Sequence, residues 1–415
     1  MRPQLSAKGM IIAACIAHSL SMICFAAYPA LLPEFTKIWS MNSTEGGSVS
    51  AAFFVGYTLS VPVLTILSDR IDPRRIYLFS SCLSATGAMG FAFMAEGPGS
   101  ASLYNGLIGA GVGGTYMPGL KALGDHIEGR LFVRATGWYT GMFGFGAALS
   151  YLVADGIFML SGWSAVFMFG AACAVASGFI IFLAIPPSDP GAVSMPFSSI
   201  TKVFSNRTAV TWSICYALHT GELFAIRSWI VAFLVFSANQ AGGTDVGLAA
   251  WFTPVTVAAV ATLLGLPMTI FGNELCIRYG RRLIVILVML ITAALAIASG
   301  ASSYLTYGIA AFFIVAYNAA IMADSSAITA GALSNAAPGL RGATMALHST
   351  LGFAGGAVGP FIVGVVLDRF GGDMSPMAWT IALGQMALVG VVCPLLIKIL
   401  RPQGAMGDRD EPAAK

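Results

Sequence analysis

The stretch TILSDRIDPRR (residues 65–75) places five charged residues between Asp69 and Arg75, with long apolar runs on both sides. Only 9% of the 415 residues are Asp, Glu, Lys or Arg, whereas soluble domains carry about 25%. A chain that is 57% hydrophobic, with a mean hydropathy of +0.82, cannot cover its folded surface with polar groups. We therefore expect an integral membrane protein in which this stretch is a turn outside the bilayer.

Apolar runs long enough to cross a bilayer flank the charged turn along the whole chain. A membrane-spanning helix needs about 20 mostly apolar residues, and its backbone polar groups must bond to one another. The sequence predicts an all-α membrane protein with twelve transmembrane helices. They cover residues 9–33, 47–67, 76–95, 101–122, 135–153, 164–186, 208–237, 247–273, 283–300, 304–331, 343–366 and 378–398.

The positions of Lys and Arg predict the orientation of these helices. Of the 21 Lys and Arg residues, all but Lys37, Arg369 and Arg227 fall on one side of the predicted membrane or at span ends on that side. Cytoplasmic loops carry such an excess. We expect a multi-pass protein of a bacterial-type inner membrane with both termini in the cytoplasm. The net charge of +3 gives no reason to expect nucleic acid as a partner.

The two halves of the chain repeat one another at an offset of 208 residues. That offset aligns DRIDPRR, from Asp69, with IRYGRRL, from Ile277, and also aligns ATGWYTGMFGFG, from Ala135, with ATMALHSTLGFA, from Ala343. Two six-helix bundles related by a parallel repeat are typical of secondary transporters. The predicted parts are a bundle at 1–186, a cytoplasmic linker at 187–207, a second bundle at 208–400 and a disordered tail at 401–415.

The charged turn also resembles the cytoplasmic signature of the major facilitator superfamily. That signature has Gly, three residues, Asp-Arg, any residue, Gly, any residue and a basic pair. Its charged positions are occupied here by Asp69, Arg70, Arg74 and Arg75, while Thr65 and Asp72 replace its glycines. The resemblance implies the family's fold, with two bundles that rock about a central site to give alternating access.

The resemblance also implies a gate at the cytoplasmic side. Asp69 would bind the positive N-terminus of the eleventh span, and Arg134 or Arg70 would complete the latch. The candidate gate residues are Asp69, Arg70, Arg74, Arg75, Arg134, Arg278 and Arg282. The alternative is a plain positively charged anchor, which explains the arginines and leaves Asp69 unexplained.

Ionisable residues inside the spans are candidates for the transport site. A charged residue at mid-bilayer costs about 2.5–3.5 kcal/mol on insertion scales, so it faces a cavity or a partner. Such residues lie in spans one, seven, ten and eleven: His18, His219, Glu222, Arg227, Asp324 and His348. By the family resemblance, spans one, four, seven and ten line the central cavity.

Glu222 is the first candidate for a proton carrier, because it lies near the centre of its span. His219 is three residues away on the same helix face and would act as its relay, with Asp324 as a further proton-coupling candidate. Arg227 is about 140° around the helix from Glu222 and needs a partner on another helix, for which Asp324 is a candidate. The alternative is that Glu222 and Arg227 are structural ions that brace the bundle.

Four residues are candidates for contact with the solute. The guanidinium of Arg227 suits a carboxylate or phosphate, and Tyr116 aligns with Asp324 at the 208-residue offset. His18 and His348 complete the set. The alternatives are that His18 packs as a hydrogen-bonded core residue, that His348 lies at a bundle interface, and that Arg227 binds an internal acid.

The sequence therefore predicts a secondary active transporter and not an enzyme. It would move a small organic solute, with an anion as one possibility, by alternating access coupled to protons. No Walker loop, HExxH, GxSxG or cluster of metal ligands is present in the sequence, so we expect no metal and no cofactor. The expected partners are a small-molecule solute, protons and lipid, with the chain as a monomer. The alternatives are drug or metabolite efflux by proton antiport and a transport-inactive membrane receptor.

Overall fold

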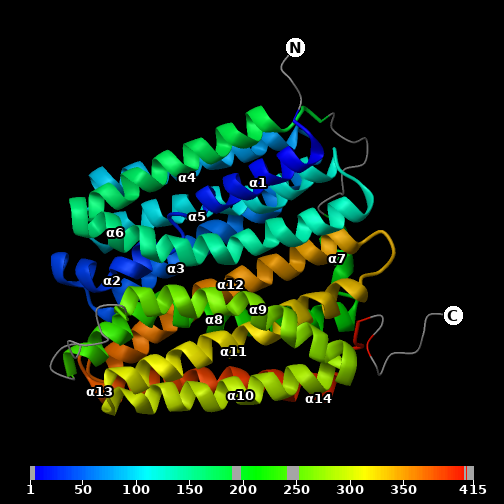
Figure 1. Ribbon diagram of the computed structural model, residues 1–415. Helices are drawn as coiled ribbons and strands as arrows, with labels where there is room; N and C mark the ends of the chain where they lie inside the picture. The colour runs from blue at the N-terminus through cyan, green and yellow to red at the C-terminus, as the bar shows by residue number, and fades with distance from the viewer. Residues whose placement is uncertain (1–4, 189–197, 241–251, 406–407, 409–415) are drawn as a thin grey trace. The chain divides into compact units, whose positions relative to one another are not determined.

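Long apolar helices make up the structure, because a backbone surrounded by lipid has no water to bond with. The computed structural model describes residues 5–188, 198–240, 252–405 and 408, and this part of the chain contains helices and no β-strand (Figure 1). The predicted all-α class is confirmed. The chain divides into unit 1, Met1–Leu31 with Ala52–Met195, and unit 2, Leu32–Ala51 with Pro196–Lys415.

The described residues 5–188 form six long or medium helices whose ends follow local signals. The carboxylate of Asp72 caps the start of α4 by accepting a bond from the backbone N–H of Arg74 at 3.0 Å. Gly162 has φ 79° and ψ 174°, so α6 comprises two helices that meet at this residue. The elements are α1 (Ala7–Ser21), α2 (Ala27–Ile38), α3 (Ser43–Leu67), α4 (Pro73–Met94), α5 (Pro98–Gly124) and α6 (Gly129–Ala184).

The first predicted span, residues 9–33, is not one continuous helix. Helix α1 ends at Ser21, and α2 begins only at Ala27. Pro29 lacks the N–H that would bond to the fourth residue before it, which weakens the helix at this point. The hydroxyl of Ser150 on α6 donates to the carbonyl of Ile23 at 2.6 Å and accepts from the N–H of Ala26 at 2.9 Å. One side chain thus satisfies two backbone groups that the break leaves without helical partners.

The second half of the chain forms the remaining helices. They are α7 (Ser198–Val203), α8 (Arg207–Gln240), α9 (Pro254–Tyr279), α10 (Arg281–Ala301), η1 (Ser302–Tyr304), α11 (Tyr307–Ser334), α12 (Arg341–Arg369), α13 (Pro376–Gly384), η2 (Gln385–Leu388) and α14 (Val389–Leu400). The start of the predicted span 247–273 and much of the predicted linker 187–207 lie outside the described residues.

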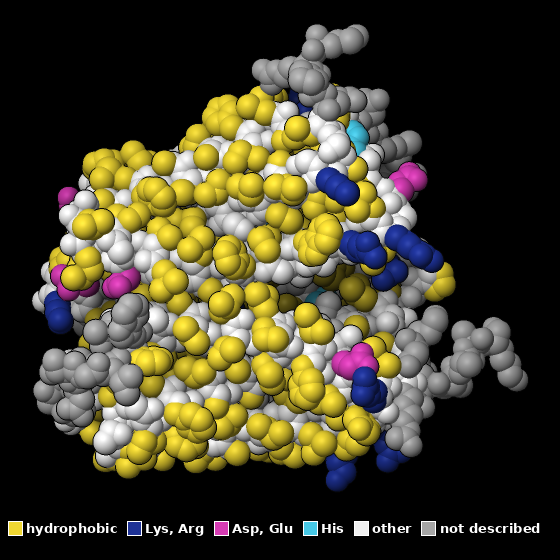
Figure 2. All heavy atoms as spheres, in the orientation of Figure 1, with side chains coloured by type: hydrophobic (Ala, Val, Ile, Leu, Met, Phe, Trp, Pro, Cys, Tyr) yellow, Lys and Arg dark blue, Asp and Glu magenta, His cyan; other side chains and the backbone are white. Residues whose placement is uncertain are grey.

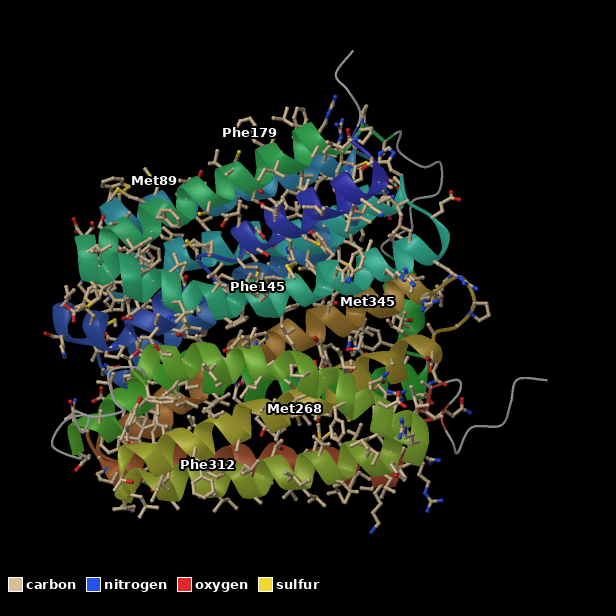
Figure 3. The ribbon with its side chains drawn as sticks, viewed as in Figure 1. Met89, Phe145, Phe179, Met268, Phe312 and Met345 are labelled. Atoms are coloured by element: carbon tan, nitrogen blue, oxygen red, sulfur yellow. The ribbon has the colours of Figure 1, made fainter. Side chains whose placement is uncertain are left out.

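The lateral surface of the helices is suited to lipid. Nine stretches of helix in the described part are long and apolar enough to cross a membrane, with α6 counted once. The count of twelve spans stays a prediction. Figure 2 shows apolar side chains over most of the visible face and Lys and Arg near its edges. Phe179 on α6 and Phe312 on α11 point outward in Figure 3 and are 51% and 67% exposed.

Helices α8 and α12 approach one another closely through glycine. A Cβ atom on Gly355 would collide with the carbonyl oxygen of Ala217, and one on Gly359 would collide with that of Gly221. Small residues allow such backbone contact in membrane helices, where packing replaces the hydrophobic effect as the main attraction. This close contact fixes the register of α8 against α12 and so places polar side chains of the two helices, such as Ser213 and His348, beside one another.

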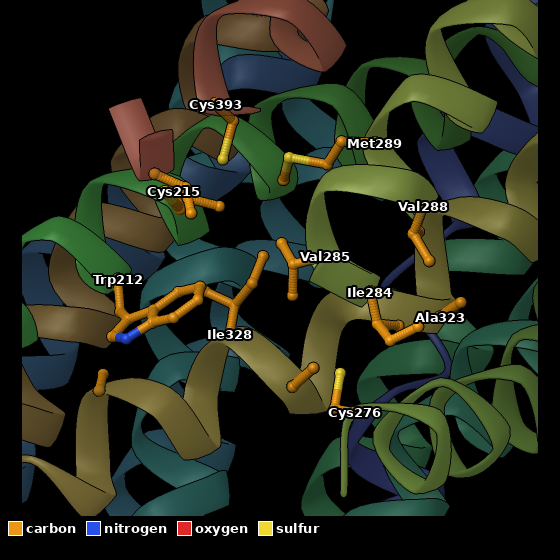
Figure 4. Close-up of a cluster of buried hydrophobic side chains, with 13 residues drawn as sticks. Trp212, Cys215, Cys276, Ile284, Val285, Val288, Met289, Ala323, Ile328 and Cys393 are labelled. Atoms are coloured by element: carbon orange, nitrogen blue, oxygen red, sulfur yellow. The ribbon is translucent and has the colours of Figure 1, made fainter. Parts of the chain in front are cut away.

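A cluster of buried apolar side chains in unit 2 lies among α8, α9, α10, α11 and α14. Figure 4 shows it, with Trp212, Cys215, Val285, Met289, Ile328 and Cys393 among its members. Trp212 is fully buried, and its indole N–H donates to the carbonyl of Gln403 at 2.8 Å. The core therefore extends to the residues that follow α14.

Described residues of the predicted disordered tail have contacts with the helices of unit 2. The side-chain amide of Asn335 donates to the carbonyl of Gly404 at 2.7 Å, and Asp408 forms an ion pair with Arg281 at 2.8 Å. Residues 401–405 and Asp408 thus pack on unit 2. Residues 406–407 and 409–415 lie outside the described part. The predicted first bundle, 1–186, also differs from unit 1, because residues 32–51 group with unit 2.

Candidate functional site

Two predicted proton-coupling residues meet inside unit 2. Nδ1 of His219 on α8 lies 2.8 Å from Oδ1 of Asp324 on α11, and their side chains are 1% and 2% exposed. The approach is an ion-pair contact rather than an aligned hydrogen bond. A charge this deeply buried needs a partner, because removing it from water costs several kcal/mol. The contact gives Asp324 a partner within its own bundle.

A second polar contact lies next to this pair along the same two helices. The hydroxyl of Tyr317 on α11 donates to Oε1 of Glu222 on α8 at 2.7 Å. Glu222 follows His219 by three residues, while Tyr317 precedes Asp324 by seven, as two antiparallel helices require. We call His219, Asp324, Glu222 and Tyr317 the polar ladder. All four side chains are buried, so the ladder is a polar seam within apolar surroundings.

Arg227 lies further along α8 and is 5% exposed. A Cβ atom on Gly265 of α9 would lie 3.6 Å from its Nη2, so the guanidinium reaches toward α9. The predicted pairing of Arg227 with Asp324 stays a prediction. The contact that the structure gives Asp324 is the one with His219.

His348 on α12 is held by hydroxyl groups from two neighbouring helices. Its Nδ1 lies 3.3 Å from Oγ of Ser213 on α8, and its Nε2 lies 3.2 Å from Oγ1 of Thr329 on α11. The ring of Tyr216 stacks on His348, with centroids 4.1 Å apart, and also lies 5.8 Å from the ring of His219. His348 therefore joins α8, α11 and α12 beside the polar ladder.

The predicted solute residues of unit 1 gather in a different kind of site. His18 is fully buried and stacks on Tyr139, with centroids 4.4 Å apart, and the rings of Tyr116 and Phe143 lie 5.5 and 6.3 Å away. We call these four residues the aromatic cluster. Within the described residues, Nε2 of His18 has no hydrogen-bond partner. The hydroxyl of Tyr116 bonds to that of Thr140 at 3.0 Å.

The predicted gate residues divide into exposed and buried ones. Nζ of Lys121 on α5 lies 3.8 Å from Asp69, with each side chain 32% exposed. Arg74 is instead buried, and it binds Asp72 at 2.7 Å and the carbonyl of Ile185 at 2.8 Å. Arg74 thus ties the start of α4 to the end of α6. The remaining exposed gate candidates are Arg70, Arg75, Arg134 and Arg278, whereas Arg282 is half-buried.

The second copy of the charged turn has one exposed and one buried ion pair. Arg278 pairs with Glu274 one turn earlier at 2.8 Å, and both side chains are exposed. Arg281 is 2% exposed and binds the carboxylate of Asp408 through two nitrogens, at 2.8 and 2.9 Å. Its third nitrogen donates to the carbonyl of Ala327 at 2.7 Å. This arginine therefore connects α10, α11 and the tail.

Sequence reasoning missed several partners in these sites. Tyr317 is two helical turns from Asp324, and Tyr139 belongs to the repeated segment ATGWYTGMFGFG, so periodicity carried a signal for both. No sequence signal pointed to Asp408, because a tail rich in Gly, Pro and charged residues is typical of disorder. Within the described residues, no group of three or more His, Cys, Asp or Glu side chains could hold a metal ion.

Comparison with known proteins now identifies the family. Residues 14–360 match the family model described as Major Facilitator Superfamily. The chain belongs to the Major Facilitator Superfamily. It is therefore a multi-pass membrane transporter by family and fold, and not an enzyme. No curated protein sequence matches it significantly.

Solved structures share this superfamily fold at low sequence identity. A bacterial homologue of the human lysosomal transporter Spinster, described as inward-facing and occupied, has a TM-score of 0.74 at 15% identity, covering 94% of this chain and 96% of that one. The nucleoside transporter NupG has a TM-score of 0.71 at 14% identity, covering 94% and 99%. An auto-inhibited POT family peptide transporter has a TM-score of 0.72 at 14% identity, covering 97% and 99%.

Proposed function

We propose that this superfamily member is a proton-coupled secondary transporter of a small organic solute. It would work by alternating access in a bacterial-type inner membrane, with both termini in the cytoplasm. The observation that carries the proposal is the contact of 2.8 Å between His219 and Asp324 at 1% and 2% exposure. Ionisable residues inside membrane spans mark proton relays and solute pathways.

The contact between His219 and Asp324 has two energetically different states. With a proton on the imidazole, the pair is an imidazolium beside a carboxylate and the two helices attract one another. Without that proton, an ionised Asp324 is a buried charge with no counter-charge from His219. Loss or gain of one proton therefore changes the attraction between α8 and α11. That coupling lets a proton bias the conformation of unit 2.

Glu222 supplies a second protonatable group next to the pair. Its carboxylate accepts a hydrogen bond from Tyr317, which a carboxylic acid would accept less strongly. Protonation of Glu222 would therefore weaken a second contact between α8 and α11. We propose that Glu222 and the His219–Asp324 pair hold the coupled proton in turn.

The solute class follows from charge and aromatic surface. Arg227 is a buried guanidinium on α8, and the aromatic cluster of unit 1 offers stacked rings beside an imidazole nitrogen with no bonded partner in the described chain. Both suit a small organic solute that carries a planar or anionic group. Structural relatives are described as nucleoside and peptide transporters, so both classes belong in a solute panel beside carboxylates.

The charged turn would act as the cytoplasmic gate. Asp69 keeps a third of its side chain exposed, and its contact with Lys121 is long at 3.8 Å. Exposed pairs of this kind contribute about 0–1 kcal/mol, so Asp69 can exchange one partner for another at small cost. This property suits a carboxylate that binds a helix terminus in only one state of the cycle.

Uptake into proteoliposomes tests the coupling. Vesicles with an imposed pH gradient and an internal pH dye would be given nucleosides, short peptides and carboxylates in turn. We expect one class to enter with protons in the wild type. In Asp324→Asn, gradient-driven uptake should be lost while exchange of labelled for unlabelled solute persists.

Two further variants complete the test. Glu222→Gln should also lose gradient-driven uptake, whereas Glu274→Gln, at an exposed acid on α9, should behave as the wild type. Undiminished gradient-driven uptake in both Asp324→Asn and Glu222→Gln would exclude the polar ladder as the proton pathway.

A further inference from the structure

The last turn of α12 binds the first turn of α3. Oδ1 of Asp368 accepts the backbone N–H of Ser43 at 2.9 Å, and Oδ2 accepts the N–H of Thr44 at 2.7 Å. The hydroxyl of Thr44 donates to the same Oδ2 at 2.6 Å. One carboxylate therefore receives three hydrogen bonds from two consecutive residues, and these bonds join segments 325 and 324 residues apart in the chain.

These bonds complete the capping of α3. Asn42 and Glu45 already bond reciprocally, at 3.0 Å from the N–H of Asn42 and 2.9 Å from the N–H of Glu45. The first turn of a helix has N–H groups without helical partners, and its dipole favours a negative charge. Asp368 takes the two amides, at Ser43 and Thr44, that the local pair does not bind. Asp368, which is distant in sequence, thus binds the N–H groups of α3 that the local cap leaves without a partner.

Close backbone contact accompanies the hydrogen bonds. A Cβ atom on Gly47 would lie 2.6 Å from the carbonyl oxygen of Pro360, and one on Gly364 would collide with the carbonyl of Ser43. Glycines on both helices therefore let α3 and α12 meet without interlocking side chains. Such a surface can separate and re-form without repacking a core.

The sequence around Asp368 repeats the pattern of the charged turn that follows α3. Gly364, three residues, Asp368-Arg369, one residue and Gly371 match the first eight positions of the family signature, including both glycines. The turn at residues 65–75 has Thr65 and Asp72 at those glycine positions. Helix α3 thus has one such pattern after its C-terminus and a second one bound to its N-terminus. The pattern at Asp368 has both glycines, Gly364 and Gly371, whereas the turn at residues 65–75 has neither.

We propose that Asp368 and the start of α3 form a releasable latch, closed in this structure and opened in another state of the transport cycle. The proposal rests on the alternating access of the proposed function. Asp368 is exposed, so water can replace the three hydrogen bonds when the helices part. The buried pair of His219 and Asp324 has no such replacement. A hydrated carboxylate with glycine-lined contact is suited to repeated opening.

Distance measurement between two spin labels tests the latch. Labels at Ile38 and Phe370, both exposed, would flank it in full-length protein in lipid nanodiscs, with Cys15 and Cys82 replaced by Ser. We expect a main short distance and a minor long one in the wild type. Loss of the charge-assisted bonds in Asp368→Ala should raise the ratio of long to short populations about tenfold or more.

Two controls make the result decisive. Asp368→Asn keeps the shape and should give an intermediate ratio. Asp373→Ala removes a carboxylate five residues further along the chain, beyond the end of α12, and should leave the distances unchanged. A single short distance in the wild type and in Asp368→Ala would show a static cap and overturn the latch. The measurement needs no solute or proton gradient, so its failure is separate from a failure of proton-coupled uptake.

Discussion

The two halves of this transporter are related by the 208-residue repeat but carry different side chains at equivalent positions. At the 208-residue offset, Tyr116 of unit 1 corresponds to Asp324 of unit 2, and Thr140 corresponds to His348. In unit 1, the Tyr116 and Thr140 side chains bond to one another at 3.0 Å. In unit 2, Asp324 instead meets His219, and His348 bonds to hydroxyl groups on α8 and α11.

This difference separates the roles that the two units can take. The aromatic cluster offers ring surfaces, hydroxyl groups and one histidine, whereas the polar ladder contains two carboxylates, a histidine and a tyrosine hydroxyl. The ladder therefore has two acidic side chains, whereas the cluster has none. In the proposed function the acids of unit 2 carry the proton, whereas Arg227 of unit 2 and the aromatic cluster of unit 1 are both candidates for contact with the solute.

The largest expected effect comes from Asp324→Ala. Because the change leaves His219 buried without its acidic partner, the free energy of unfolding should fall by about 3–5 kcal/mol. The measurement is reversible unfolding in mixed detergent micelles. Tyr116→Ala removes a half-buried side chain at the equivalent position of unit 1 and serves as the matched change. If both variants lost the same stability, the contrast between a charged and an aromatic site would be wrong.

Tyr317→Phe should have the next largest effect. It removes the hydroxyl that donates to Glu222 and leaves a buried acceptor with one bond fewer, at a cost of about 1–3 kcal/mol. The control is Tyr307→Phe, whose hydroxyl donates to the carbonyl of Phe252 at an exposed position. The midpoint of thermal unfolding should be lower for Tyr317→Phe than for Tyr307→Phe. Equal midpoints would argue against a buried polar ladder.

Replacing each buried histidine by phenylalanine compares the halves directly. His348→Phe gives up contacts with Ser213 and Thr329. His18→Phe keeps the stacking on Tyr139 and gives up a long contact of 3.5 Å with Ser21. We expect His348→Phe to be less stable than His18→Phe by about 1 kcal/mol. Chemical unfolding of the two variants side by side checks this order, and the reverse order would refute it.

The smallest expected effect is that of Lys121→Met. Its contacts with Asp69 and Asp125, at 3.8 and 3.5 Å, are both partly exposed, and exposed pairs contribute about 0–1 kcal/mol. The unfolding midpoint should barely move. Arg281→Met, at the buried counterpart in the second copy of the turn, should lower it clearly. A large loss from Lys121→Met would mean that the first turn is as tightly held as the second.

Much of the fold was predictable because lipid imposes strict rules on sequence. The apolar runs identified the helices, and the scarcity of buried charge drew attention to His219, Glu222 and Asp324. The break in the first span was harder to foresee, because Ser150 lies 127 residues from the carbonyl that it binds. No local pattern contains that contact.

The pairing of the site residues was less predictable than their identity. Asp324 contacts His219 in the structure, and these two residues lie on different helices, so only the register of α8 against α11 brings them together. The pairing of Asp324 with Arg227 stays a prediction. Asp368 escaped attention for a related reason. Its acidic side chain lies near a span end, where charged residues are common. Its hydrogen-bond partners are at the start of a helix more than 300 residues away in the chain.

The buried pair between Arg281 and Asp408 has a practical consequence for handling the protein. A shortened version that stops at the end of α14 would strand the guanidinium of Arg281 in a dry environment and free the indole N–H of Trp212. Affinity tags and fluorescent fusions are therefore best joined after Asp408. A version trimmed before that residue should express poorly for reasons unrelated to its ability to carry solute.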